Sequence, residues 1–448
     1  MVVTTSIEVT TGKIMAIEDD VLVIGGGLAG SMAALVAAER DLRVRLLTYK
    51  RSTLVNASGL IDVLGYAPGE KGPVVDPFEA IADLPVGHPY ERVGVDAVRD
   101  GLLFFDAVMG ESYRGSHTDA NALVPTTGGT VKPTARYPAG VAAGLASLPR
   151  STLLVGFETL PGFDAPLAAA RLQGADVPFS VRGVTIEFPG IDREDAKRTR
   201  YAHLLDRDIF GEDGVNRSIR ATLAERIRPH LDGESRVGLP AILGEENAGV
   251  VRRDLEERLG VDVFEVPTGP PSLPGLRLEA QLYDALESTG VRVTTGVPVV
   301  GYEAANVPVD DGERRRIDCA LVDREGTSVP YSAEEYVLAT GGLVGRGIRS
   351  DRERIYEPIF DCHVEASNDR YDWFTEDAFG DHPFARFGVG VDRALRPLDA
   401  DGDPEFANLR AAGAVLAGSD FAAEKSGSGV SIATGYAAGS RAAAEVDG

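Results

Sequence analysis

The stretch that most constrains the fold of this chain is Val21-Leu-Val-Ile-Gly-Gly-Gly-Leu-Ala-Gly30. Its four leading apolar residues predict a buried parallel strand. The pattern Gly25-x-Gly27-x-x-Gly30 then leads into residues 31–39, which favour a helix, and a second apolar run follows at 44–48. The order of strand, glycine turn, helix and strand predicts a βαβ unit with a nucleotide-binding turn.

Each glycine of this motif has a separate predicted role. Gly25 allows the tight turn, Gly27 lets a pyrophosphate approach the backbone, and Gly30 lets the helix pack closely on the strand. Together with Gly26, Leu28 and Ala29, they bring the helix N-terminus and its free N–H groups to the phosphate. The alternative is a glycine-rich turn in an ordinary α/β fold, but the flanking strand and helix favour a nucleotide site.

One expected residue is missing from the motif. Dinucleotide sites usually place an Asp or Glu at the end of the second strand, where it binds the ribose. Here that end reads Thr48-Tyr-Lys-Arg51. Either the adenosine half of a dinucleotide is held in another way, or the ligand is a mononucleotide such as FMN.

The composition limits the class of protein. At 448 residues the chain is long enough for two or three domains, and no run of apolar residues is long enough to predict a transmembrane helix. The N-terminus has no signal-peptide pattern, so a cytoplasmic protein is expected. Residues 1–14 are predicted to be a disordered tail or an over-extended gene start, with Met15 as the alternative to Met1.

The charge of the chain is strongly negative. The formal net charge is −24, and only six of the 45 basic residues are lysine. This balance suggests a halophilic protein from a high-salt cytoplasm, although an ordinary acidic cytosolic protein is the alternative. Nucleic acid is a poor candidate for a partner because no basic stripe is present. The two cysteines, Cys319 and Cys362, are too few to hold an iron–sulfur cluster or a structural zinc ion, and no metal site is expected.

The remaining patterns predict how the chain is divided. A helix is expected at 96–109, loop-like sequence at 121–137, an Ala-rich helix from Pro138 to about Leu148, and alternating strands and helices over 152–270. An amphipathic helix at 276–288, β-hairpins, the strand ending Ala339-Thr-Gly341 and a C-terminal helix follow. The predicted fold class is α/β, a Rossmann-like two-dinucleotide-binding-domain flavoprotein with an inserted α/β domain. Residues 15–66 and 270–448 would form the flavin domain, and 67–269 the inserted substrate or interface domain.

Several blocks make the chain resemble the B subunits of anaerobic glycerol-3-phosphate dehydrogenases, almost from end to end. The most specific block is Pro267-Thr-Gly-Pro-Pro-Ser-Leu-Pro-Gly-Leu-Arg-Leu278. The others are Ile24–Gly30, Ser58–Leu64, His88-Pro-Tyr90, Gly129-Thr130 with Arg136, Val337–Gly341, Phe387-Gly-Val389, Leu395-Arg-Pro397, Ala412–Gly418 and Gly427-x-Gly-Val430.

The resemblance implies a cofactor, a reaction and partners. The cofactor is FMN, with FAD as the alternative, and the missing acidic residue after Thr48 suits FMN. The reaction is oxidation of sn-glycerol 3-phosphate to dihydroxyacetone phosphate, with electrons passed to a quinone in glycerol catabolism. The partners are two further subunits of the same complex, one that contains FAD and one that carries iron–sulfur clusters. These would hold the chain at the inner face of the membrane.

The same blocks supply further candidate site residues. Cofactor contacts are expected from Ser58, Gly59, Thr340, Gly341, Gly413, Gly427 and Gly429. Substrate phosphate needs cations, for which Lys132, Arg136 and Arg396 are the candidates, and the catalytic candidates are His88, Arg136 and Arg277. For His88 the competing interpretation is a structural cap, and for the cations it is ion pairing within the fold.

Two other functions remain open at this point. The chain can serve in electron transfer or assembly within that complex, with a flavin that never meets substrate, because no obvious His–Arg constellation stands out. It can also be another flavin oxidoreductase of the fumarate-reductase type, which would need an Arg/His-rich active site on the inserted domain.

Overall fold

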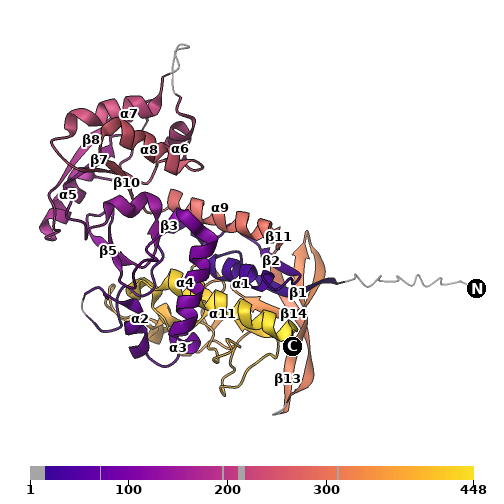
Figure 1. Cartoon of the computed structure of the whole chain (residues 1–448). Coiled ribbons are helices and arrows are strands. Elements are labelled where there is room, and N and C mark those ends of the chain that lie inside the picture. Colours follow the sequence, from indigo (N-terminus) through magenta and orange to yellow (C-terminus); the bar gives the residue numbers. More distant parts are fainter. Residues whose placement is uncertain (1–15, 71, 194–195, 210–216, 310–311, 448) are drawn as a thin grey trace, which may run out of the picture.

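The predicted βαβ unit forms the centre of the molecule. The computed structural model describes residues 16–70, 72–193, 196–209, 217–309 and 312–447 (Figure 1), so the predicted tail at 1–14 lies outside the described residues. In β1 (Ile17–Ile24), residues 21–24 are buried because the strand pairs in parallel with β2 (Val44–Thr48) on one side and with β14 (Thr327–Leu338) on the other. Between β1 and β2, α1 (Leu28–Ala38) is buried along nearly its whole length.

Seven strands of the described chain form one sheet, in the order β11-β2-β1-β14-β13-β12, and β17 also pairs with β14. The added strands are β11 (Arg292–Thr295), β12 (Val299–Val309), β13 (Gly312–Arg324) and β17 (Leu409–Ala411). The neighbouring strands β11, β2, β1 and β14 pair in parallel, and β17 also pairs with β14 in parallel. By contrast, β12, β13 and β14 form an antiparallel meander. The carboxyl ends of β1, β2, β11 and β14 therefore meet at one edge of the sheet.

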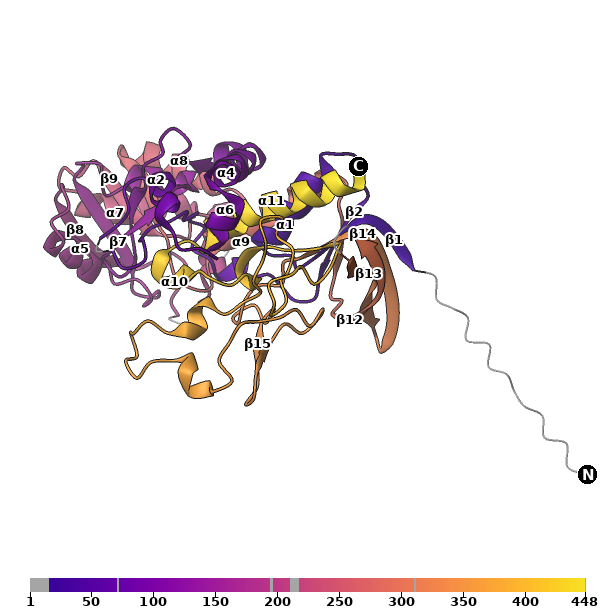
Figure 2. The ribbon, with the colours of Figure 1, turned by 90° about the horizontal axis from the view of Figure 1, so that it is seen from below.

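Helices from both ends of the chain cover this sheet. The long α11 (Gly427–Asp447) packs along α1, and α4 (Val95–Met109) packs against α11 (Figure 2). The crossover helix α9 (Leu273–Ser288) leads into β11, and α3 (Pro89–Val93) touches α11. Shorter helices are α2 (Pro77–Ala80) and α10 (Phe421–Glu424).

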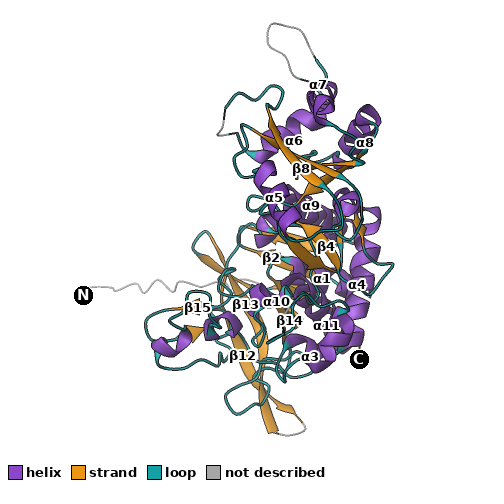
Figure 3. Cartoon of the chain, turned by 90° about the vertical axis from the view of Figure 1, so that its left-hand side faces the viewer, coloured by secondary structure: helices purple, strands orange, loops and turns teal. Residues whose placement is uncertain are grey.

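The segment with its own sheet is shorter than the predicted insertion of 67–269. A second, all-parallel sheet runs in the order β10-β9-β7-β8. Its strands are β7 (Thr152–Phe157), β8 (Val181–Ile186), β9 (Arg236–Pro240) and β10 (Asp262–Val266), and its helices are α5 (Ala165–Gly174), α6 (Arg198–Arg207), α7 (Ile219–Ile227) and α8 (Ala248–Leu259). These elements form a separate body beside the large sheet (Figures 1 and 3).

Residues 78–113 were predicted to belong to the inserted domain, but their apolar side chains join the core of the large sheet. Phe78, Tyr90, Leu102 and Phe105 are buried in the same cluster as β1 and α11. Leu153 to Val263 contribute instead to separate clusters around the second sheet. Helices α3 and α4 therefore belong with the large sheet, and the second body spans 152–266.

The stretch 121–148 also differs from the expectation of a loop followed by an α-helix. Short antiparallel pairs form here from β4 (Ala122–Pro125) with β5 (Val131–Thr134), and from β3 (Tyr113–Arg114) with β6 (Tyr137–Pro138). Pro138 opens only a 3₁₀ segment, Ala139–Gly144. A Cβ on Gly144 would lie 2.1 Å from the Phe264 ring, so this segment packs too tightly on β10 for an ordinary helical side chain.

Two further features complete the fold. A small hairpin forms from β15 (Arg349–Ser350) and β16 (Ile355–Tyr356). No helix of the described chain combines the length and apolar character needed to cross a bilayer.

Candidate functional site

A pocket of about 400 Å³ opens at the carboxyl edge of the large sheet, where the glycine motif leaves β1. It is lined by Gly25, Gly26 and Gly27, by the end of β2 and the following residues to Thr53, and by residues 297–300 before and in β12. The rest of the lining is Ile24 together with 339–341, 345–347, 349 and 358–359, which follow β14. Segments far apart in sequence meet here because their strands are neighbours in the sheet. This edge is the place where α/β sheets bind nucleotides.

The three motif glycines meet different surroundings. Gly25 has φ of +121°, and a Cβ there would lie 2.2 Å from the carbonyl oxygen of Ala339 on the neighbouring strand. A Cβ on Gly30 would lie 1.8 Å from the carbonyl oxygen of Gly25. A Cβ on Gly27 would meet no described atom within 4 Å, so it would project into open space. Gly25 and Gly30 thus allow the close packing, and Gly27 leaves the way to α1 open.

The N-terminus of α1 has no side-chain cap from its N-cap residue. Gly27 occupies the N-cap position, and no side chain there accepts a hydrogen bond from the first turn. The N–H groups of a first helical turn need acceptors, and the positive end of the helix dipole favours an anion. Leu28 and Ala29, two of the predicted cofactor residues, lie in this turn.

The charge of the lining points to an anionic ligand. Lys50, Arg51, Arg346 and Arg349 are part of the lining, and no described Asp or Glu is. In a chain with a net charge of −24, this is a local reversal of sign. Thr340 adds a buried hydroxyl that has no hydrogen-bond partner among the described residues.

These residues fit a flavin that carries phosphate. The uncapped helix end, the open space at Gly27 and the four cations suit a phosphate or pyrophosphate. The orphan Thr340 hydroxyl would gain a partner. Gly341, another predicted cofactor residue, belongs to the same lining.

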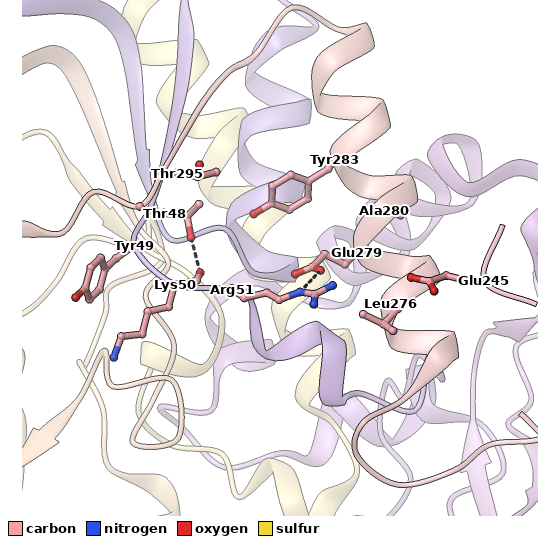
Figure 4. A pocket seen from close by; sticks show the side chains of 11 residues that line it. Thr48, Tyr49, Lys50, Arg51, Glu245, Leu276, Glu279, Ala280, Tyr283 and Thr295 are labelled. Carbon is pink, nitrogen blue, oxygen red and sulfur yellow. Dashed lines mark hydrogen bonds and ion pairs between the residues drawn. The ribbon is translucent and has the colours of Figure 1, made fainter. Parts of the chain in front are cut away.

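A second cavity of about 450 Å³ adjoins this pocket and shares the residues Thr48 to Arg51 with it (Figure 4). Its far wall is the face of α9 that carries Glu279 and Tyr283. The Tyr283 hydroxyl donates a hydrogen bond to the carbonyl oxygen of Gly26 at 3.3 Å. The Nε of Arg51 donates to Glu279 at 3.2 Å. The sequence pattern predicts that α9 is amphipathic but does not single out Glu279 or Tyr283. Their contacts with Arg51 and Gly26 depend on which strand ends α9 covers, and the sequence pattern does not show this.

The other predicted cofactor residues lie outside the lining of the glycine pocket. Gly413 packs against Ala29, where an added Cβ would lie 2.7 Å from the Ala29 methyl group, and Gly59 packs against Pro274. Gly427 begins α11. Gly429 donates its N–H to the carbonyl oxygen of Asp62 at 2.8 Å. Ser58 and Gly59 belong to the segment 58–63, which meets the N-terminus of α11 through the Gly429–Asp62 bond.

His88 is enclosed by the fold at this junction. It is the N-cap of α3, where its Nδ1 accepts a hydrogen bond from the N–H of Tyr90 at 3.1 Å. Its Nε2 lies 3.2 Å from Glu424, and the Ser426 hydroxyl also donates to Glu424, at 2.8 Å. Burial alone would raise the pKa of Glu424, but the hydrogen bond and charge of His88 and the bond from Ser426 hold the pKa below its ordinary value.

The predicted cationic residues do not converge on one site, since each of them is paired with its own carboxylate. Lys132 Nζ lies 2.5 Å from Asp62, Arg136 Nε 2.9 Å from Asp106, Arg277 Nη1 2.6 Å from Glu265 and Arg396 Nη2 2.8 Å from Asp392. Burial raises the pKa of Asp62 and of Asp106 despite these partners. For Arg277, burial acts to lower the pKa, but the adjacent Glu265 carboxylate raises it above its ordinary value.

Arg277 also lines the largest of the cavities described here, a cleft of about 920 Å³ between α9 and the second body. Its guanidinium donates to the carbonyl oxygen of Gly244 at 2.8 Å in addition to its pairing with Glu265. Arg114, Arg252, Arg253 and His203 bring further basic groups to the cleft, together with several carboxylates. The mixed charge of this cleft contrasts with the cationic lining of the glycine pocket.

Comparisons with known proteins identify the family of this chain. The family model described as FAD binding domain matches residues 20–430. The probable B subunit of anaerobic glycerol-3-phosphate dehydrogenase from Halobacterium salinarum is 60% identical over 430 residues, which are 96% of this chain and 99% of that protein. Its counterpart in Vibrio cholerae is 31% identical over 437 residues, covering 93% of this chain and 94% of that protein.

Among solved structures, a 3-ketosteroid Δ1-dehydrogenase from Sterolibacterium denitrificans is similar over 96% of this chain and 99% of its own, at 12% identity and a TM-score of 0.43. The match to the FAD-binding family confirms the predicted Rossmann-like flavoprotein fold class, and the relatives confirm the resemblance found in the sequence. The chain belongs to the FAD-binding-domain family and, within it, to the B subunits of anaerobic glycerol-3-phosphate dehydrogenase.

Proposed function

We propose that this chain binds a flavin in the glycine pocket and takes part in the oxidation of sn-glycerol 3-phosphate to dihydroxyacetone phosphate. The observation that carries the proposal is a cationic pocket at an uncapped helix N-terminus, in a chain that is 60% identical to the B subunit of a glycerol-3-phosphate dehydrogenase. A bound flavin supplies a hydride acceptor for the secondary alcohol. The chain's own residues would hold its phosphate through Gly27, the first turn of α1 and the four cations.

Electrons would pass onward to a quinone through partner proteins. We propose two such partners, an FAD-containing subunit together with an iron–sulfur subunit, because the relatives are named as one subunit of a larger enzyme. Both cysteines of this chain, Cys319 and Cys362, are buried and unpaired. Cluster ligation would then fall to the iron–sulfur partner. The chain would lie on the cytoplasmic side, held at the membrane only by these partners.

A second candidate function is electron transfer or assembly without direct contact between this chain and the substrate. The observation that favours it is that Lys132, Arg136, Arg277 and Arg396 are each paired with an internal carboxylate. A phosphate dianion would have to displace these carboxylates, two of which, Asp62 and Glu265, are buried. His88 is likewise enclosed and bonded on both ring nitrogens.

One experiment separates the two functions. The purified chain would be tested for reduction of an artificial dye with glycerol 3-phosphate, alone and with the FAD-containing partner, while the absorbance of the flavin is recorded. Turnover by the chain alone supports direct oxidation of the substrate. Flavin reduction that requires the partner supports electron transfer. Absence of any flavin in protein isolated under native conditions and after reconstitution would contradict both.

A further inference from the structure

A long arm of the chain, residues 365–388, projects from the body of the molecule beside the β15–β16 hairpin (Figures 2 and 3). Its two ends meet at a β-bridge between Val364 and Val389, and Val389 is fully buried in the main core. The structure describes the whole arm, which forms two short 3₁₀ segments, Arg370–Trp373 and Pro383–Arg386. Loops of this length without longer helices or strands are uncommon in compact domains and usually have a function.

Four aromatic side chains of the arm are open to solvent. The exposed fraction is 99% for Phe379, 71% for Tyr371, 48% for Phe374 and 42% for Phe384. Exposed aromatic side chains gathered in one segment mark an interaction site, because a partner that covers them removes their apolar surface from water. Large aromatic side chains also carry much of the binding energy at protein interfaces.

Interactions within the arm hold the backbone and one of the rings. The Nδ1 of His382 accepts a hydrogen bond from the N–H of Thr375 at 3.1 Å, and this bond closes the loop that carries Phe379. The His382 ring stacks on Phe384, with 5.2 Å between the ring centroids. The N–H of Phe379 donates to the Asp377 carboxylate at 3.0 Å. A surface fixed in this way loses less conformational entropy when it binds a partner.

The charge of the arm indicates the kind of partner. Two arginines of the arm, Arg370 and Arg386, stand against six exposed carboxylates, those of Glu365, Asp369, Asp372, Glu376, Asp377 and Asp381. A complementary protein surface therefore has an apolar pocket for the rings and basic side chains around it. A second copy of this chain would bring the same negative charge, and anionic lipid headgroups would repel the carboxylates.

The arm begins close to the glycine pocket. Pro358 and Ile359, which precede it in the chain, are part of the lining of that pocket. Five residues separate Ile359 from Val364 at the base of the arm, and a chain spans at most about 3.6 Å per residue. The base of the arm therefore lies within about 18 Å of the pocket lining.

We propose that the arm is the docking site for the partner protein that takes electrons onward from the flavin, and we assign this role to the iron–sulfur partner. Its docking face would have an apolar pocket that receives Phe379 and Tyr371, bordered by Lys and Arg side chains that pair with the carboxylates of the arm. A partner bound there would lie beside the flavin pocket. This inference rests on the proposed function, since it requires both the flavin and the partner.

The test measures binding of the full-length, flavin-loaded chain to the purified iron–sulfur partner by biolayer interferometry. Phe379→Ala and Tyr371→Ala should each weaken binding by about ten-fold or more, mainly through faster dissociation. Both side chains are largely exposed, so the urea midpoint and the flavin content should stay at the wild-type values. The matched control, Leu103→Ala, removes an exposed apolar side chain from α4 and should leave binding unchanged.

Glu376→Lys tests the electrostatic part of the inference. Reversal of this exposed charge should slow association by about three-fold or more at about 0.3 M salt. The effect should disappear near 1 M salt, where the Debye length is about 3 Å. Association that is equally fast in wild type and Glu376→Lys at the lower salt would overturn the proposed basic border of the partner surface.

The other outcomes separate this inference from the proposed function. Wild-type affinity of both aromatic variants for the iron–sulfur partner would overturn the inference and leave the flavin site intact. Two further results would also overturn it: weaker binding of the FAD-containing partner instead, or a dimer of the chain alone that Phe379→Ala dissociates in sedimentation. A wild-type chain that holds no flavin and binds neither partner would overturn the proposed function as well.

Discussion

At the scale of single residues, two glycines of one motif are predicted to respond differently to substitution. Gly27→Val places its side chain in open pocket space, at an ordinary φ of −84°, so it should abolish stoichiometric flavin while the protein stays folded. Gly30→Val drives its Cβ into the carbonyl oxygen of Gly25 and should destabilise the fold by about 1–3 kcal/mol, as over-packed sites do. The absorbance of bound flavin tests the first variant, and the midpoint of urea unfolding tests the stability of both. A Gly27→Val protein that keeps stoichiometric flavin would contradict the placement of the phosphate.

The enclosed His88–Glu424 pair gives a prediction for pH. Glu424→Gln should lower the free energy of unfolding at pH 7 by about 1–3 kcal/mol, because a buried charge-assisted bond is lost. The pKa of Glu424 in the folded state lies below its ordinary value of 4.5, so the stabilisation is fully present above that value and is lost as pH falls below it. The difference between wild type and variant, measured by urea unfolding, should therefore shrink below about pH 4.5. A constant difference down to about pH 3 would contradict this assignment.

At the scale of elements, Arg236 joins the 3₁₀ segment Ala139–Gly144 to the second sheet. It begins β9, is fully buried, and donates to the Thr152 hydroxyl at 2.7 Å and to the carbonyl oxygens of Ala143 and Leu145 at 2.7 and 3.0 Å. Burial lowers the pKa of Arg236 to about 10. Lysine cannot reproduce this planar set of donors. Arg236→Lys should therefore cost about 2–3 kcal/mol, because buried acceptors lose their partners.

The matched control for this element is Arg253→Lys on α8. Arg253 is exposed, so its replacement should change the free energy of unfolding by less than about 0.5 kcal/mol. Urea unfolding of both variants gives the comparison. If Arg236→Lys is as stable as Arg253→Lys, the link between the 3₁₀ segment and the second sheet is not maintained by the guanidinium.

At the scale of the whole molecule, the net charge of −24 predicts that stability depends on salt. Lowering salt from about 1 M to about 0.1 M lengthens the Debye length from about 3 to about 10 Å, so repulsion among surface carboxylates reaches further. The urea midpoint should therefore fall over this range. Retention of flavin should fall with it, since the pocket forms only where separate segments of the chain meet. An unchanged or higher midpoint at low salt would remove the high-salt interpretation without affecting the flavin site.

The sequence by itself determined the helices, strands and turns whose formation depends on residues close together in the chain. The strand at 21–24, the glycine turn, α1, α4, α9 and α11 are all present close to their predicted positions, because apolar periodicity and helix propensity are encoded within each segment. The glycine turn at the carboxyl edge of the large sheet was predictable for the same reason, since three glycines at fixed spacing specify one turn. The family was also recognisable, because its specific blocks are contiguous stretches of sequence.

Tertiary structure alone decided which distant segments share a surface. Residues 78–113 joined the core of the large sheet because α4 packs on the C-terminal α11, a contact that no local pattern encodes. Four of the five predicted catalytic and phosphate-binding side chains were paired with carboxylates at least 12 residues away in the chain, on Asp62, Asp106, Glu265 and Glu424, and Arg396 was paired with the nearby Asp392. Glu279 came to the end of β2 through the crossover of α9. The sequence shows that a carboxylate is present, but which side chains it meets in space depends on the packing of the elements that carry them.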